Sequence, residues 1–267
     1  EEAIQKAKDI GDYDYLLPAY DFIIYIDGYY YDLKKLGEDI ERLEAVLLKD
    51  STFIPQQVYT KYTKEILLSK ANYYYKLNDF SNAKSTLKRL ENDILSIPLS
   101  ERPLEFDSIL ESTYSFLATI YKWENKYQLS EDYYDQAIEI IENNLESFKN
   151  PKAEIAKNKL LLATLFTKKG DFEQAISIQK NILPNYKNKT SSNGYLSTIL
   201  SLTKNYIQVK DTKNAQVLLT ELGNIDNLNP RFNLRFLALK AEYYQLTKDD
   251  KLALETLNTH LDCTFAY

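Results

Sequence analysis

Few residues in this chain have the types and spacing that catalysis or metal binding requires. The sequence holds one histidine, His260, and one cysteine, Cys263, three positions apart near its C-terminal end. Such a pair can act as base and nucleophile, but it needs a cleft and a third group that orients the base. A last helix supplies neither, so we expect the pair to be structural. A single histidine and a single cysteine also exclude a multi-histidine metal site and an intramolecular disulfide.

Carboxylates are numerous, and three of them cluster at Glu131, Asp132 and Asp135. Paired carboxylates can perform acid–base chemistry, but on an acidic helical protein such clusters are usually a solvated surface. The sequence contains no glycine-rich phosphate loop, no paired metal-ligand spacing and no serine elbow. The sequence therefore predicts a protein that is not an enzyme, with no catalytic residue, no metal and no cofactor.

The charge balance and the hydropathy limit which partners and which compartments are expected. The 267 residues include 33 lysines and arginines against 39 acidic residues, a net charge of −6, so no basic face is expected for nucleic acid. No apolar run approaches the ~18 residues of a membrane span. Methionine is missing even at position 1, which indicates a processed product or an excised fragment. The compartment stays open: the cytoplasm is favoured, and an extracytoplasmic segment of an anchored protein is the alternative.

The elements that would position any site are easiest to identify between residues 160 and 183. Apolar residues there recur with the 3.6-residue period of a helix, on both sides of a turn at Asp171. Ala163 is followed three positions later by Phe166, and twelve positions later by Ala175. Two small residues let the helices cross closely, and the aromatic ring fills the space beside the crossing. This stretch therefore predicts a helical hairpin.

The same spacing of a small residue, an aromatic, a turn residue and a second small residue recurs along the chain. It is complete in two further places and is altered at one or more positions in three others: Ala71, Tyr74, Asp79, Ala83; Ala241, Tyr244, Asp249, Ala253; Thr203, Tyr206, Asp211, Ala215; Ala118, Tyr121, Lys126, Ser130; and Ile24, Asp27, Asp32, Leu36. Six helical pairs thus fit one template, at approximately 15–48, 62–91, 108–145, 153–183, 195–222 and 231–261. Six prolines, at positions 55, 98, 103, 151, 184 and 230, fall between these pairs, where they interrupt no predicted helix.

At these offsets the sequence resembles the tetratricopeptide repeat family, whose motif has the same small, aromatic and turn positions. The resemblance implies an all-α fold, a right-handed superhelical solenoid of about six helical hairpins that forms a single domain over residues 1–267. The second small residues are 38 to 47 positions apart, which is longer than the standard repeat of about 34 residues. We therefore expect lengthened helices or connections.

The resemblance also implies a concave groove lined by the first helix of each pair. Positions one, four and five after the first small residue tend to face that groove, and they place an aromatic stripe with neighbouring polar groups in the first three pairs. The candidate binding residues are Tyr25, Tyr29, Asn72, Tyr75, Lys76, Thr119, Lys122 and Trp123. Aromatic anchors beside adaptable polar groups are typical of a peptide-binding surface. The alternative is that Tyr75 and Trp123 pack against a neighbouring helix.

Two function classes follow from this fold. The first is an interaction scaffold or adaptor that binds a peptide or protein segment in the groove. The second is the sensory or regulatory segment of a larger signalling or transcription-regulating protein. The C-terminal end carries an apolar edge, Leu254, Leu257, Leu261 and Phe265, with no polar helix after it. We expect a second copy of the chain or flanking sequence to cover that edge.

Overall fold

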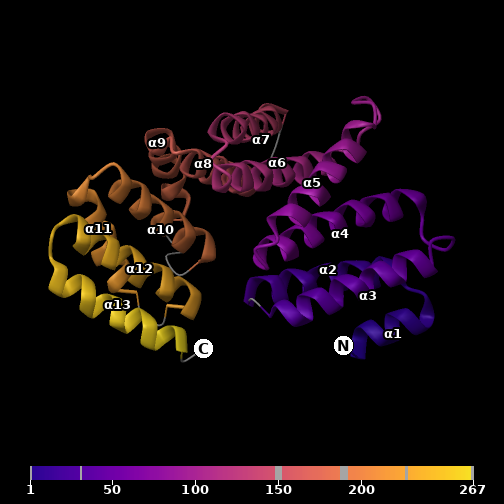
Figure 1. The fold of residues 1–267 in the computed structure, drawn as a ribbon, viewed down its shortest axis with the longest axis horizontal. Coiled ribbons are helices and arrows are strands. Elements are labelled where there is room, and N and C mark those ends of the chain that lie inside the picture. Colours follow the sequence, from indigo (N-terminus) through magenta and orange to yellow (C-terminus); the bar gives the residue numbers. More distant parts are fainter. Residues whose placement is uncertain (1, 31, 148–151, 187–191, 226–227, 266–267) are drawn as a thin grey trace. The chain divides into compact units, whose positions relative to one another are not determined.

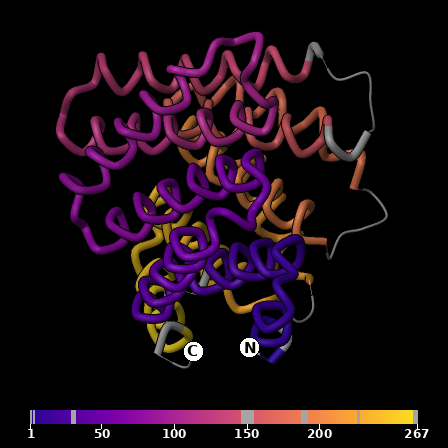
Figure 2. Tube along the Cα trace, turned by 90° about the vertical axis from the view of Figure 1, so that its right-hand side faces the viewer, coloured from indigo at the N-terminus to yellow at the C-terminus, as the bar shows by residue number. Residues whose placement is uncertain are grey.

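The computed structural model describes residues 2–30, 32–147, 152–186, 192–225 and 228–265. These residues form helices joined by connections, with no strand among them (Figure 1). The chain divides into two compact units, Glu1–Ala137 and Ile138–Tyr267, and the boundary falls inside one helix. A view from a second direction follows the same helices along the sequence (Figure 2).

The first unit begins with a short helix and continues with three helical pairs, the last of which runs past the unit boundary. Its helices are α1 Glu2–Ile10, α2 Tyr13–Tyr30, α3 Leu33–Lys49, α4 Gln56–Lys76, α5 Phe80–Leu95, α6 Glu105–Trp123 and α7 Tyr127–Ser147. The second unit holds the rest of α7 and three further pairs. Its elements are α8 Lys152–Lys169, α9 Phe172–Ile182, the 3-10 turn η1 Leu183–Tyr186, α10 Asn193–Gln208, α11 Thr212–Gly223, α12 Pro230–Leu246 and α13 Asp250–Phe265.

Consecutive helices pack as antiparallel hairpins, namely α2/α3, α4/α5, α6/α7, α8/α9, α10/α11 and α12/α13 (Figure 1). This arrangement confirms the expected all-α fold of six hairpins. The right-handed superhelix and the single domain remain predictions.

The two helices of a hairpin meet at the small residues of the template. The following alanines have no exposed surface: Ala71, Ala83, Ala118, Ala163, Ala175 and Ala215. Ser130, which replaces the second alanine in the third hairpin, is buried too, and its Oγ donates a hydrogen bond of 2.8 Å to the carbonyl oxygen of Ala118. A larger side chain at such a crossing would force the helices apart. The crossing therefore fixes how these pairs pack, whereas the first hairpin buries the larger Ile24 and Leu36 at the same positions.

The turn inside a hairpin has its own recurring geometry. The residue before the turn carboxylate adopts a left-handed backbone, with φ of 59° at Asn78 and 60° at Lys210. The aspartate that follows then caps the second helix, since the side chains of Asp79 and Asp211 accept hydrogen bonds from the backbone N–H groups of Asn82 and Asn214. Asp32, Asp171 and Asp249 cap their helices in the same way. The turn aspartates of the template are thus helix N-caps.

Two proline positions show how this residue is used. Pro230 is the first residue of α12, where the missing N–H would have no helical partner. Pro18, which is not among the six prolines between the pairs, lies in the second turn of α2 with its ring exposed. One helix of this chain therefore does contain an interior proline.

The C-terminal edge is apolar, and its described leucine side chains are exposed to solvent. Leu254, Leu257 and Leu261 of α13 are exposed, while the side chain of Phe265 lies outside the described residues. Cys263 is partly buried and packs against the core of the second unit. The cover that we expect for this edge stays a prediction. None of the described helices is long and apolar enough to cross a membrane.

The left-handed residue at position 210 gives a stability prediction. This backbone costs a residue with a Cβ roughly 1–2 kcal/mol, and the greater freedom of glycine in the unfolded chain offsets part of any gain. We expect Lys210→Gly to raise the free energy of unfolding by up to about 1 kcal/mol in urea denaturation. Lys204→Gly, at an exposed lysine in the middle of α10, should lower it by about 1 kcal/mol. Equal destabilisation by both variants would contradict the turn geometry.

Candidate binding face on α2, α4 and α6

The first helices of the three hairpins in the first unit form one continuous surface, because α4 contacts both α2 and α6. A Cβ atom on Gly28 of α2 would lie 3.8 Å from the side-chain nitrogen of Asn72 on α4. The ring of Tyr75 on α4 lies 5.7 Å from the ring of Phe116 on α6, centre to centre. We call this surface the α2/α4/α6 face; it includes the candidate residues of these three helices.

The aromatic candidates differ in how much of each side chain solvent can reach. Trp123 is 68% exposed and Tyr25 is 65% exposed, so both rings are open to a partner. Tyr75 is partly buried, and its ring packs against Phe80 and Phe116 on the neighbouring helices. The side chain of Tyr29 lies outside the described part of the structure. Packing against a neighbouring helix therefore describes Tyr75 but not Trp123.

The polar candidates have unequal roles. Thr119 donates a hydrogen bond of 2.8 Å to the carbonyl oxygen of Ser115, and its Oγ1 lies 3.1 Å from the hydroxyl of Tyr134 on α7. Thr119 therefore connects the two helices of its own hairpin. Asn72 and Lys76 are partly buried on α4. Lys122 is exposed on α6, one position before the open tryptophan.

An acidic group on the same face is absent from the sequence-based candidates. It consists of Asp21 on α2 and Glu65 on α4, with Lys61 as the neighbouring cation. One oxygen of Glu65 lies 3.8 Å from the Lys61 ammonium, while the other, Oε2, is buried and has no hydrogen-bond partner. Burial, and next the charge of Asp21, raise the pKa of Glu65 to about 7. Burial also raises the pKa of Asp21. In its ionised form this group therefore carries negative charge that one lysine does not fully compensate.

The sequence offers a signal for this group that the template offsets do not use. Those offsets cover only the C-terminal part of each first helix, whereas α4 is 21 residues long. Glu65 precedes Asn72 by seven positions, which is two helical turns and hence the same face. Extending the face toward the N-terminus of α4 would have found Glu65.

The side chains on this face have properties that suit binding contacts. Among the described residues, no group of three or more histidine, cysteine or acidic side chains could hold a metal ion. Open aromatic rings supply contact area at little cost in frozen torsions. The undercompensated carboxylates attract a positive charge, most strongly where they are shielded from water. The arrangement suits a cationic side chain flanked by apolar ones.

The raised pKa of Glu65 gives a pH prediction. Its folded value of about 7 lies above the usual 4.5, so the folded state binds this proton more tightly than the unfolded state does. The contribution of Glu65 to the free energy of unfolding must then fall as the pH rises from about 4.5 to about 7. We expect Glu65→Gln to be more stable than the wild type at about pH 8, and equally stable at about pH 4, in urea denaturation.

Glu131→Gln is the matched control for this prediction, because Glu131 is an exposed carboxylate on α7. Its stability difference from the wild type should not change over the same pH range. A Glu65→Gln variant that behaves like this control would show that Glu65 ionises as it does in water.

Comparison with solved structures assigns the fold. No family model matches the sequence, and no curated protein matches it. The crystal structure of BtubC (BKLC) from P. vanneervenii is similar with a TM-score of 0.54 and 18% identity, over 88% of this chain and 90% of that one. A Rap protein complexed with Competence and Sporulation Factor gives a TM-score of 0.56 and 14% identity, over 92% of this chain and 65% of that one. The apo form of RapI gives a TM-score of 0.52 and 10% identity, over 93% and 97%. These likenesses show the fold alone: the chain is a helical-repeat protein with the fold of the tetratricopeptide-like repeats.

Proposed function

We propose that this protein is a non-catalytic binding module that holds a segment of a partner protein on the α2/α4/α6 face. The observation that carries the proposal is the combination, on one face, of open aromatic rings and undercompensated acidic groups. Helical-repeat proteins use the surface formed by successive first helices because each hairpin adds a few contacts to a continuous strip. A Rap protein with this fold is complexed with Competence and Sporulation Factor, which supports a binding role.

The charge of the face indicates which segment it accepts. Glu65 keeps one buried carboxylate oxygen without a hydrogen-bond partner, and Asp21 adds a second negative charge nearby. A lysine or arginine of the partner would supply the missing donor, and the resulting charge-assisted hydrogen bond is among the stronger ones in proteins. The proposed partner segment therefore carries at least one basic side chain.

The exposed rings indicate what surrounds that basic side chain. Trp123 and Tyr25 are large, mostly exposed and held on helices. Residues of these types dominate the binding energy in many interfaces. The partner segment should place apolar or aromatic side chains next to its basic residue. We propose that the carboxylates set the register and that the rings supply most of the affinity.

A selection experiment tests the proposal with defined probes. A random peptide library is panned on the immobilised protein, and the enriched peptides are synthesised and titrated by calorimetry. We expect the enriched peptides to combine lysine or arginine with apolar residues. Trp123→Ala should weaken binding by roughly 2 kcal/mol, because it removes an anchor that stabilises the complex and not the fold. Glu65→Gln should weaken binding of basic peptides and reduce its dependence on salt concentration.

Phe53→Ala is the control, since Phe53 is an exposed aromatic between α3 and α4 rather than on the face. It should bind the selected peptides as the wild type does. Enrichment of acidic peptides, or equal binding by the Trp123→Ala variant, would overturn the proposal.

The second candidate function is a regulatory segment that passes a binding signal to another part of a larger protein. The likeness to Rap proteins favours it, because one of them is solved with a bound factor and the chain covers only 65% of that Rap protein. In that case a selected peptide should change the dimensions of the protein in solution as well as bind to it. Unchanged X-ray scattering upon peptide binding would favour the plain scaffold.

A further inference from the structure

The first unit contains a cavity of about 660 Å³ between α1, α2 and α3. This volume lies within the range of small-molecule sites in proteins. Its walls include the aliphatic side chains of Ile4 from α1, Ile23 from α2 and Val46 from α3. Three carboxylates also line it, Asp27 from α2, Asp39 from α3 and Asp50 at the C-terminal end of α3. The cavity thus combines aliphatic walls with charged side chains, buried acidic groups among them.

The repeat template accounts for the positions of Asp27 and Asp39. Asp27 stands at the position that carries an aromatic ring in the other five hairpins, and that ring is buried at Tyr121, for example. In the α6/α7 hairpin, Tyr121 stacks on Tyr133 with ring centres 5.5 Å apart. Asp39 lies three positions after Leu36, as Tyr133 lies three positions after Ser130, so the two residues share one position of the template. Two carboxylates in the first hairpin therefore stand at the template positions of the two rings that stack in the α6/α7 hairpin, and both carboxylates line the cavity.

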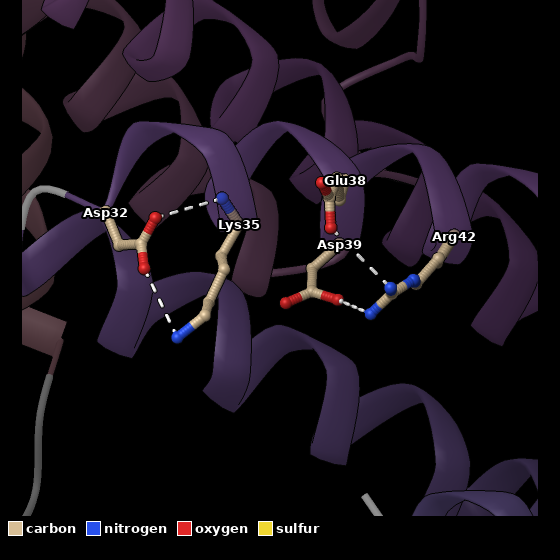
Figure 3. Close-up of polar contacts among 5 residues, drawn as sticks. All are labelled: Asp32, Lys35, Glu38, Asp39 and Arg42. Carbon is tan, nitrogen blue, oxygen red and sulfur yellow. Dashed lines mark hydrogen bonds and ion pairs between the residues drawn. The ribbon is translucent and has the colours of Figure 1, made fainter.

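The cationic side chains near these carboxylates are shared with other acids. Asp39 is only 6% exposed, and its Oδ1 accepts a hydrogen bond of 2.8 Å from Arg42. The same guanidinium also lies 3.6 Å from Glu38, which does not line the cavity (Figure 3). Lys35 is likewise engaged, 3.2 Å from Asp32 (Figure 3). The buried acidic charge of the cavity is therefore compensated only in part.

Asp27 shows this lack of compensation most clearly. Its Oδ2 is buried and has no hydrogen-bond partner. Burial raises the pKa of Asp27, a hydrogen bond with the Asp39 side chain and the charge of Asp39 raise it further, and Lys35 opposes them. Ionisation of Asp27 is therefore costly to the fold unless a cation neutralises the charge.

We propose that this cavity binds an organic cation, with its ammonium or guanidinium group at Asp27 and Asp39. Its aliphatic or aromatic body lies between the walls formed by Ile4, Ile23 and Val46. The site is separate from the α2/α4/α6 face, and its ligand is a small molecule rather than a protein segment.

A negatively charged ligand fits the cavity less well. The remaining cationic residues of the lining, Lys8 and Lys49, are exposed, so water solvates them. The acidic residue Asp39, by contrast, is buried. Charge that is shielded from water attracts its partner more strongly than charge in water does. The preference of the site is therefore set by its carboxylates.

A series of three probes with the same six-carbon body tests the proposal. Hexylamine, hexanol and hexanoate differ only in the headgroup, which is positive, neutral or negative at neutral pH. Binding is measured by calorimetry and by chemical-shift changes in the full chain. We expect hexylamine to bind in a 1:1 ratio at least roughly tenfold more tightly than hexanol, the usual gain of a charge-assisted contact. Hexanoate should bind least.

Two variants connect the binding to this cavity. Asp27→Asn keeps the shape and removes the charge, so it should weaken hexylamine binding roughly tenfold and leave hexanol unchanged. Asp27→Tyr restores the residue type of the template and fills the space, so it should abolish binding of all three probes. Glu41→Gln, at an exposed acid of α3 that does not line the cavity, is the matched control and should bind as the wild type does.

The outcomes that overturn the proposal are distinct from those of the peptide experiments. Equal affinity for hexylamine and hexanoate, or no binding of any probe, contradicts it on the wild type alone, so the result does not depend on the variants folding. Hexylamine binding that survives Asp27→Tyr would place the ligand elsewhere. Trp123→Ala should retain hexylamine binding, because that residue belongs to the other site.

Discussion

The close crossing of two helices at small buried residues is the contact on which the rest of this structure depends. Where Ala71 meets the second helix of its pair, no side chain separates the helices, and the neighbouring positions pack at short range. The N-capping aspartate of the turn then sets where the second helix begins. Because the α4/α5 and α6/α7 hairpins share this crossing and α4 also contacts α2, the successive first helices in the first unit line up. This alignment of the first helices places the exposed rings and acidic groups of the α2/α4/α6 face on one side.

The first hairpin departs from this pattern in a way that changes its chemistry. The other hairpins fill the space beside the crossing with a ring, and apolar burial there contributes to stability. Asp27 and Asp39 contribute charge in place of that apolar area. Buried carboxylates generally destabilise a fold, so a chain that keeps them often uses them for binding. The template position that carries an aromatic ring in the other hairpins thus identifies where the cavity of the first hairpin lies.

Sequence reasoning predicted the hairpins because their determinants are local. The spacing of small residues, aromatics and turn aspartates fixes which residues are buried within one pair, and Ala163 and Ala175 are buried as expected. The same reasoning placed Tyr25 and Trp123 at surface offsets of their helices, and both rings are exposed; their role in binding stays a prediction.

Features that depend on several helices were harder to predict. The acidic group joins Asp21 and Glu65 from different hairpins, and its pKa shift arises from burial that no sequence pattern reports. The ring contacts of Tyr75 depend on Phe116, forty-one positions later in the chain. The cavity required the structure, since Asp27 in the sequence alone is a departure from the template without a known consequence. Pro18 inside α2 likewise lies outside the pattern of the six prolines that fall between the pairs.

Hydrogen exchange with a bound peptide tests the central claim, that the first helices of the hairpins in the first unit form the partner-binding surface. Exchange is followed by mass spectrometry in the full chain, with and without a basic peptide selected on the wild type. The account predicts that the peptide slows amide exchange in α2, α4 and α6 and leaves the second helices α3 and α5 unchanged. Slower exchange confined to α3 and α5, with α2, α4 and α6 unaffected, would contradict it.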